Sequence, residues 1–335
     1  MESKIKLTDK QIEKWLYDEE PEFNIKDFRQ KHNIDSESST LNVVFLRLMQ
    51  ENRLKRIGRG VYKKIHPIKA ITSLKVSDPR PFDLRFPMGA DDCSVFGWDD
   101  KIRIDKGDLI LIAGSGNSCK TSWVLNMIAE NMDYHPCLLM GNEYAKDDNE
   151  LSAKFADRMV RMLPWANWYK EGTETLKFEI LPVDEDYEMW VQHDKINFID
   201  WINMTGEAGK EFYLTAKMLK DIKFKLGRGV GIVVLQKPEG RDWGVGGERT
   251  KDLADLYLSI DNVPNSFERK VTIVKCKAAT ENMDRRMWAF SVVDGGTCFH
   301  GIREIIMCPR CRGKSATIGG KCDECNQKGF VNKEN

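Results

Sequence analysis

The sequence has no excess charge of either sign, no long apolar run and no low-complexity tract. It holds 52 Lys and Arg against 52 Asp and Glu in 335 residues, so its formal net charge is zero. This balance excludes a uniformly basic nucleic-acid coat and an acidic tail protein, although it permits local basic patches. No stretch of about 18 apolar residues is present, so we expect no membrane-spanning helix. The N-terminus lacks a signal-peptide core, and we expect a cytoplasmic protein.

The nine cysteines do not follow the pattern of a disulfide framework. Five are scattered singly along the chain, at Cys93, Cys119, Cys137, Cys276 and Cys298. The others form two C-x-x-C pairs ten residues apart, Cys308 with Cys311 and Cys322 with Cys325. This usage is typical of a reducing compartment. Two such pairs can complete a tetrahedral Zn²⁺ site, and four thiolates leave no open coordination position. We therefore expect a structural zinc ribbon over residues 305–335, with a redox dithiol as the alternative.

Residues 1–65 predict three helices followed by a hairpin. Apolar residues at helical spacing define the third helix, and Leu54–Ile57 and Val61–Ile65 flank a glycine turn. This order resembles a winged helix-turn-helix domain. From Arg47 to Lys69 there are eight Lys or Arg and one acid, so the charge gathers on the third helix and the hairpin. We expect duplex DNA contacts there, with protein contact or oligomerisation as the alternative. The candidate residues are Lys55, Arg56, Arg59 and Lys63.

The rest of the chain predicts a linker and an α/β core. Residues 66–90 contain four prolines and little periodicity, which favours a linker. Residues 91–304 alternate apolar runs with helical patterns, and continuous apolar runs are typical of strands covered on both faces of a largely parallel sheet. The predicted strands are Leu109–Ala113, Cys137–Gly141, Ile196–Ile199, Val230–Leu235, Leu256–Ile260, Val271–Lys275 and Met287–Val293.

The first of these strands runs directly into a phosphate-binding loop. The loop reads GSGNSCKT and a helical pattern follows it, which is the strand–loop–helix context that a P-loop needs. Backbone N–H groups of such a loop point at an anion, the lysine faces the β- and γ-phosphates, and the threonine hydroxyl ligates Mg²⁺. A cysteine stands where the Walker A pattern has its second glycine. The predicted ATP-binding residues are Gly114, Ser115, Gly116, Asn117, Ser118, Cys119, Lys120 and Thr121.

The later landmarks resemble the RecA/DnaB class of motor ATPases across roughly residues 91–302. Strand ends carry Asn142-Glu143-Tyr144, then Asp200, then Gln236, and the segment Val274–Ala279 reads VKCKAA. The resemblance implies that Glu143 orients the attacking water and that Asp200 holds Mg²⁺ through water. It implies that Gln236 senses the γ-phosphate. It also implies that Lys275 and Lys277 reach into a neighbouring subunit's active site, so the protein would form a ring or filament. Lysines guarding an edge strand are the alternative.

The same resemblance implies that the loop after Gln236 contacts single-stranded DNA. Residues 237–251 contain four glycines, several basic side chains and one tryptophan, a composition that suits phosphate contact with base stacking. A flexible solvated loop is the alternative, since three acidic residues offset part of the charge. The candidate residues are Lys237, Arg241, Trp243, Arg249 and Lys251.

The sequence as a whole predicts a DNA-dependent ATPase of replication or recombination that uses ATP, Mg²⁺ and Zn²⁺. A ring-forming DnaB-like helicase is the first hypothesis. A RadA- or RecA-like recombination ATPase without helicase activity is the second. The third is a DNA-binding regulator whose P-loop senses nucleotide without hydrolysing it, which the cysteine at position 119 favours.

Overall fold

The computed structural model divides the chain into two compact units, Met1–Asp78 and Pro79–Asn335. It describes residues 8–17, 19–35, 38–51, 53–65, 80–90, 92–144, 150–202, 211–264, 266–317 and 320–333. Residues 66–79 of the predicted linker lie outside this set. Among the described residues, no helix is long and apolar enough to span a bilayer.

The first unit contains three helices and a three-stranded antiparallel sheet. Its elements are α1 (Asp9–Tyr17), β1 (Glu22–Asn24), α2 (Ile25–Lys31), α3 (Ser39–Gln50), β2 (Leu54–Gly58) and β3 (Val61–Lys64), with strand order β1-β3-β2. The apolar face of α3 supplies Leu41, Val44 and Phe45 to a core that α1 and α2 complete with Ile12 and Phe28. The predicted helices and hairpin are thus present. The winged helix-turn-helix assignment itself stays a prediction.

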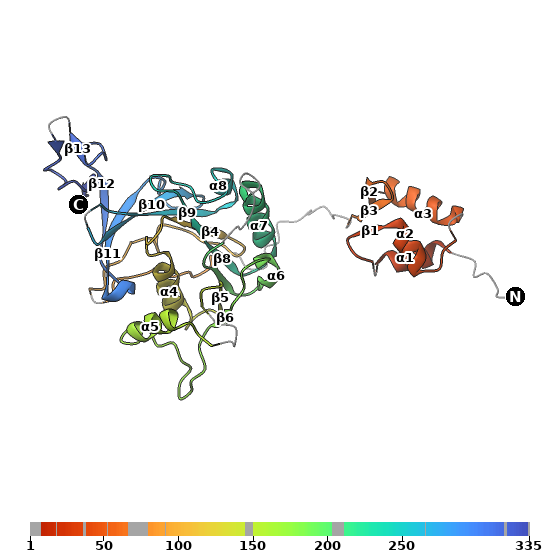
Figure 1. The fold of residues 1–335 in the computed structure, drawn as a ribbon, viewed down its shortest axis with the longest axis horizontal. Coiled ribbons are helices and arrows are strands. Elements are labelled where there is room, and N and C mark those ends of the chain that lie inside the picture. Colours follow the sequence, from red (N-terminus) through yellow and green to blue (C-terminus); the bar gives the residue numbers. More distant parts are fainter. Residues whose placement is uncertain are drawn as a thin grey trace. The chain divides into compact units, whose positions relative to one another are not determined.

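The second unit is built on a ten-stranded sheet in the order β15-β12-β11-β10-β9-β4-β8-β7-β5-β6 (Figure 1). Its strands are β4 (Leu109–Gly114), β5 (Cys137–Met140), β6 (Glu179–Leu181), β7 (Ile196–Ile199), β8 (Val230–Gln236), β9 (Leu256–Asn262), β10 (Glu268–Cys276), β11 (Met287–Val293), β12 (Cys298–Met307) and β15 (Phe330–Asn332). A separate two-stranded hairpin pairs β13 (Ala316–Thr317) with β14 (Gly320–Lys321).

The sheet is parallel from β9 to β6 and antiparallel from β9 to β15. All seven predicted strands are present. The prediction of a largely parallel sheet does not cover one side of the sheet. There, the antiparallel strands β10, β11, β12 and β15 extend it beyond β9. The strand that enters the phosphate loop, β4, lies inside the parallel part, between β8 and β9. The predicted α/β class, with a largely parallel sheet that carries the phosphate-loop strand, is confirmed.

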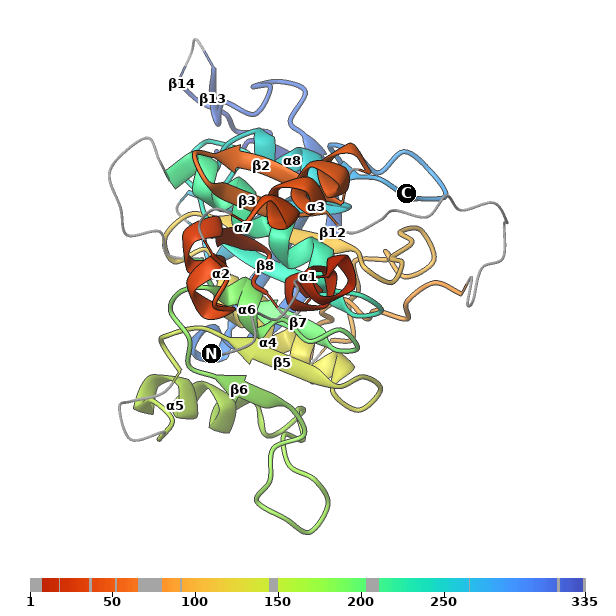
Figure 2. The ribbon, with the colours of Figure 1, turned by 90° about the vertical axis from the view of Figure 1, so that its right-hand side faces the viewer.

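Helices cover both faces of the parallel part. These are α4 (Lys120–Asn131), α5 (Ala153–Met162), α6 (Tyr187–Trp190), α7 (Glu211–Lys225) and α8 (Arg249–Leu253). Side chains of β4 alternate between two cores: Ile110 and Ile112 pack with α4 and α5, whereas Leu109 and Leu111 pack with α6 and α7. Figure 2 views the sheet from the side of α6 and α7. Because β4 is buried on both faces, its position, and therefore that of the loop after it, is fixed.

Two predicted boundaries need correction. Leu84 and Phe86 fall in the predicted linker but are buried in the core of the second unit, where Phe86 packs edge-on against Trp98. The part of the linker that the structure describes therefore belongs to that unit. The predicted zinc ribbon begins at residue 305, yet β12 continues to Met307 and β15 pairs with it. The cysteine segment is thus flanked by two paired strands of the main sheet, β12 and β15.

Candidate nucleotide site and cysteine centre

The phosphate loop leaves β4 at Gly114 and enters α4 at Lys120. A Cβ on Gly114 would lie 2.2 Å from the Ser118 hydroxyl, so the close approach of the loop to the strand requires glycine. Cys119 has φ 65°, the left-handed conformation that glycine adopts most easily. The sequence therefore departs from the Walker A pattern at Cys119, but the backbone conformation there is one that glycine favours. Burial raises the pKa of the Cys119 thiol to about 12, so the thiol is inert.

Lys120 lies in this loop with few partners. Its Nζ donates to the backbone carbonyl of Ser115 at 2.7 Å. Burial lowers the pKa of Lys120, and the negative charges of Asp200 and Glu143 oppose that shift. These carboxylates are therefore close enough to act on the lysine, as expected for groups at the carboxyl ends of neighbouring parallel strands. The buried Ser118 hydroxyl has no hydrogen-bond partner in the described part of the chain.

Asp200 follows β7 and is 2% exposed. The Tyr144 hydroxyl donates to its Oδ2 at 2.5 Å, while its Oδ1 has no partner among the described residues. Burial raises the pKa of Asp200, and hydrogen bonds from Tyr144 and Thr121 oppose the shift. Asn197, the polar residue within β7, is satisfied by the backbone of Gln192 and therefore does not disturb the strand. A carboxylate oxygen without a partner beside the Thr121 hydroxyl fits a hard cation such as Mg²⁺.

Glu143 and Gln236 complete the same end of the sheet. Glu143 follows β5 with an exposed side chain, and the Trp201 indole N–H lies 3.5 Å from its Oε1. Gln236 ends β8, directly beside Gly114 in the parallel register of β4 and β8. The structure thus brings Lys120, Thr121, Glu143, Asp200 and Gln236 together. Sequence reasoning missed Tyr144, the hydrogen-bond donor to Asp200.

Two further side chains reach the phosphate loop from the β9–β10 hairpin, and sequence reasoning missed both. Asn262 Nδ2 donates to the carbonyl of Gly116 at 3.2 Å, and an Arg269 Nη2 donates to that of Asn117 at 3.4 Å. No local motif marks them, because they lie about 150 positions from the loop. The only available signal was the antiparallel return of the chain after β9.

Part of the loop after Gln236 is held against the sheet by Lys237 and Trp243. Lys237 has a fully buried side chain whose Nζ contacts Asp261 at 2.5 Å, Ser259 at 2.6 Å and the Arg241 carbonyl at 2.8 Å. The predicted DNA contact by Lys237 is therefore corrected, because its ammonium group is buried and pairs with Asp261 inside the protein. Trp243 is half-buried on the core and lies edge-on to Tyr257.

Parts of this loop remain accessible. Arg241 and Arg249 have exposed side chains, and Lys251 is half-buried with its Nζ 5.2 Å from the centre of the Trp243 ring. This stacking partly covers the face that a base would need. The accessible cations of the predicted DNA loop are therefore the two arginines.

Lys275 and Lys277 lie at the end of the sheet opposite the phosphate loop. Lys275 pairs in register with Tyr257, and Tyr257 pairs with Leu111 near the start of β4. Lys277 forms an ion pair with Asp255 at 3.1 Å, which raises the pKa of Lys277. Lys275 Nζ donates to the Lys251 carbonyl at 2.7 Å. Neither lysine can reach the phosphate loop of its own chain.

In the first unit, the hairpin presents the predicted cations to solvent. Exposed side chains are those of Lys55, Arg56, Arg59 and Lys63. Lys63 pairs with Glu22 at 2.6 Å. The expectation that the charge extends over the third helix is wrong, because Arg47 of α3 pairs with Asp9 at 2.7 Å and Glu13 at 2.5 Å. Of the basic residues from Arg47 to Lys64, Lys55, Arg56 and Arg59 thus stay exposed without an ion pair among the described residues.

The four paired cysteines converge on one point. Their sulfur atoms all lie within 4.8 Å of one another, with Cys308 and Cys322 3.8 Å apart and Cys311 and Cys325 3.6 Å apart. These separations are close to the ~3.8 Å between ligands of a tetrahedral site with Zn–S bonds of about 2.3 Å, and far above the ~2.05 Å of a disulfide. The Gly329 N–H points at Cys325 Sγ, a typical supporting hydrogen bond. The residues therefore fit zinc.

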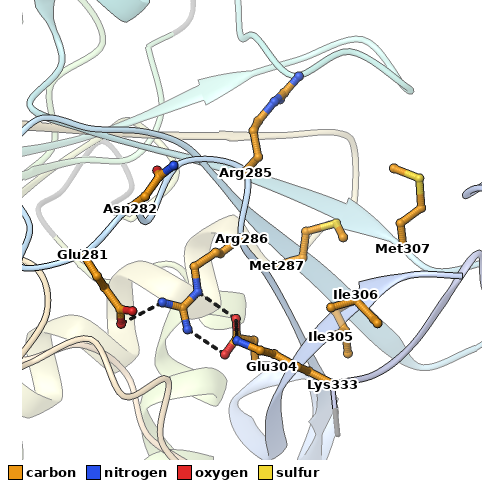
Figure 3. Close-up of a pocket in the computed structure, with 10 residues that line it drawn as sticks. All are labelled: Glu281, Asn282, Arg285, Arg286, Met287, Glu304, Ile305, Ile306, Met307 and Lys333. Carbon is orange, nitrogen blue, oxygen red and sulfur yellow. Dashed lines mark hydrogen bonds and ion pairs between the residues drawn. The ribbon is translucent and has the colours of Figure 1, made fainter. Parts of the chain in front are cut away.

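A separate hollow of about 360 Å³ opens where β11 starts and β12 ends (Figure 3). Arg286 crosses it and makes two 2.7 Å hydrogen bonds to the Glu304 carboxylate and a 2.8 Å ion pair with Glu281. Lys333 also contacts Glu304 at 3.0 Å. Because these charges are mutually paired, the hollow offers a ligand little charge of its own.

Comparisons with known proteins give a distant structural likeness only. No family model and no curated protein matches the sequence. Among solved structures, the chain is similar to a KaiC-like protein from the hyperthermophilic archaeon Pyrococcus horikoshii, with a TM-score of 0.46 and 16% identity over 65% of this chain and 99% of that one. It is also similar to a RadB recombinase, with a TM-score of 0.41 and 13% identity over 59% of this chain and 92% of that one.

Proposed function

We propose that the protein is a DNA-dependent ATPase acting in replication or recombination. The observation that carries the proposal is the gathering of Lys120, Thr121, Asp200 and Glu143 at one end of the parallel strands, where the buried Ser118 hydroxyl and Asp200 Oδ1 have no partner among the described residues. A structural cluster satisfies its buried polar atoms internally, whereas a binding site keeps them for a ligand.

Each side chain has a distinct task in this proposal. Lys120 leaves its bond to the Ser115 carbonyl and pairs with the β- and γ-phosphates. Thr121 and Asp200 would hold Mg²⁺, which would neutralise phosphate charge. Glu143, exposed at the tip of β5, orients the attacking water. Gln236 lies beside Gly114 and relays the state of the γ-phosphate to the loop that follows it.

The experiment that tests this function is ATP hydrolysis by the purified chain, measured with and without single-stranded DNA, followed by unwinding of a forked duplex. Stimulated hydrolysis with unwinding supports a ring-forming, DnaB-like helicase. Stimulation without unwinding supports a recombination ATPase. An absence of hydrolysis, with nucleotide binding retained, would overturn the ATPase in favour of the nucleotide-sensing regulator.

We also propose that the active enzyme is a homo-oligomer in which Lys275 and Lys277 serve a neighbouring phosphate loop. Their place at the far end of the sheet supports this, because a role in hydrolysis requires a second copy. Lys275→Ala/Lys277→Ala and Glu143→Gln should each be inactive alone. Mixed oligomers should regain partial activity, since some interfaces then join an intact Glu143 to intact lysines. A flat rate across a titration of the two, with assembly confirmed by light scattering, would remove this proposal.

For the first unit, two partners are supported by different surfaces. The exposed hairpin cations support contact with duplex DNA, which depends on counterion release. The side chains of Val43 and Leu46 on α3 are 62% and 56% exposed, which supports contact with a protein. A triple change of Lys55, Arg56 and Arg59 to Gln should flatten the salt dependence of duplex binding and leave basal hydrolysis unchanged. An unchanged slope would favour the protein contact.

A further inference from the structure

The tip of the β9–β10 hairpin borders the phosphate loop, and Arg269 is the charged residue at that border. Asn262 and Arg269, on the two strands of the hairpin, lie opposite each other in the antiparallel ladder. Both donate to loop carbonyls, those of Gly116 and Asn117. The loop edge is therefore framed by side chains that come from outside the P-loop motif.

The Arg269 guanidinium keeps part of its hydrogen-bonding capacity. Its Nη1 donates to the carbonyls of Phe267 and Glu268, at 3.2 and 3.1 Å, and its Nε is buried with no partner in the described part of the chain. No carboxylate pairs with it among the described residues. Its positive charge acts on the Cys119 thiol together with that of Lys120 and lowers the pKa of that thiol against the larger effect of burial. The two cations therefore lie near the same part of the loop.

We propose that Arg269 is a nucleotide-binding residue that donates to a phosphate oxygen of a nucleoside di- or triphosphate held by its own chain's loop. This inference rests on the proposed function, since it needs a nucleotide in the P-loop. A planar guanidinium with free N–H groups matches the geometry of phosphate oxygens. Such an oxygen can accept from the Nη2 end of the guanidinium, which already faces the loop at the Asn117 carbonyl.

Glu268, the residue before Arg269, joins the β9–β10 hairpin to the cysteine segment through an ion pair. Glu268 is 9% exposed and forms ion pairs with Arg303 of β12 and, at 2.6 Å, with Lys328 beyond Cys325. Val263, near the hairpin tip, packs in one cluster with Phe330 of β15. Successive residues of a strand point to opposite sides, so Glu268 can hold the cysteine segment while Arg269 faces the loop. Glu268 is thus a positioning residue for Arg269.

Nucleotide affinity of the full chain, measured by isothermal titration with ADP and with adenosine, tests the proposal. Arg269→Gln should weaken ADP binding by about tenfold to a hundredfold, the effect of one hydrogen bond to a charged group, and leave adenosine binding unchanged. Lys270→Gln is the matched control, because it removes the same charge from the neighbouring residue, which lies near Asp261 at 3.7 Å. Arg269→Lys should restore part of the loss.

Equal ADP affinity for Arg269→Gln and the parent chain would overturn the proposal, as would an equal loss for adenosine and ADP. A parent chain that does not bind ADP would overturn the proposed function instead. Glu268→Gln should weaken ADP binding less than Arg269→Gln and add nothing to it in the double variant, as expected for a residue acting through another. Full additivity would refute the positioning role.

Discussion

The loops that leave the neighbouring strands β4 and β8 both contain glycines and a lysine, but the two lysines are bonded in opposite ways: Lys120 is half-buried and Lys237 is fully buried. Lys120 has one hydrogen bond, to a carbonyl of its own loop. Lys237 has three partners, including the carboxylate of Asp261. Burial lowers the pKa of both. The difference shows that burial of a cation does not identify a binding site; its unsatisfied bonding capacity does.

The largest expected effect is the loss of turnover in Lys120→Ala. Removing the cation that faces the phosphates should lower the ATPase rate by at least about 100-fold, the scale of losing one preorganised electrostatic contact. The unfolding free energy should change little, because Lys120 makes a single hydrogen bond in the protein. Steady-state ATPase assays test the loss of turnover, and urea unfolding tests whether the unfolding free energy stays nearly unchanged. Full turnover would contradict the P-loop assignment.

Lys237→Ala should have the reverse effect. It leaves the Asp261 carboxylate without its buried partner, and breaking a buried ion pair costs about 3–5 kcal/mol. Urea unfolding should show this loss, whereas the ATPase rate per folded molecule should change far less than in Lys120→Ala. A stable variant with weakened DNA binding would contradict the structural role of Lys237 and restore its role as a DNA contact.

Asp200→Asn should separate function from stability. Turnover should fall by about 100-fold, because a bound Mg²⁺ would supply several kcal/mol of charge stabilisation and Asp200 would help to hold it. The nucleotide-free protein should gain stability, because the folded-state pKa of Asp200 is raised and ionising it opposes folding. That penalty begins as pH rises above the unfolded pKa of about 3.9 and is complete above the raised folded pKa. The gain in Tm should therefore be larger at neutral pH than below about pH 4, where the carboxyl is protonated in both states. An equal gain in Tm at the two pH values would contradict the raised pKa of Asp200.

The smallest expected effect is that of Cys119→Gly. Glycine relieves the left-handed strain of about 1–2 kcal/mol, but it loses the packing of a half-buried side chain against the core. The two effects offset each other to within about 1 kcal/mol, and hydrolysis should persist or rise. Inactivation by this change, measured in the same ATPase assay, would assign the thiol a role that its geometry does not suggest.

The sequence predicts those parts of the site that can be recognised within a short continuous segment. The P-loop and the two C-x-x-C pairs have fixed spacing, and Glu143, Asp200 and Gln236 follow apolar runs that become parallel strands. Lys237 could not be assigned in this way, because its local sequence is polar and its partner Asp261 lies on β9. Arg269 and Tyr144 were missed for the same reason: their roles depend on contacts with distant residues, for which no spacing rule exists.

The ion pair between Glu268 and Lys328 also bears on the order in which the protein is made. A ribosome releases β4 to β11 well before β15, and the sheet order places the last strand at the outer edge, beside β12. The α/β core from β4 to β12 can therefore assemble during synthesis before β15 emerges. Glu268 gains Lys328 only after the cysteine segment has been made. A chain that stops after Met307 should keep the ion pair of Glu268 with Arg303 and lack the one with Lys328, so the cysteine segment supplies the last of the two ion pairs that hold the start of β10.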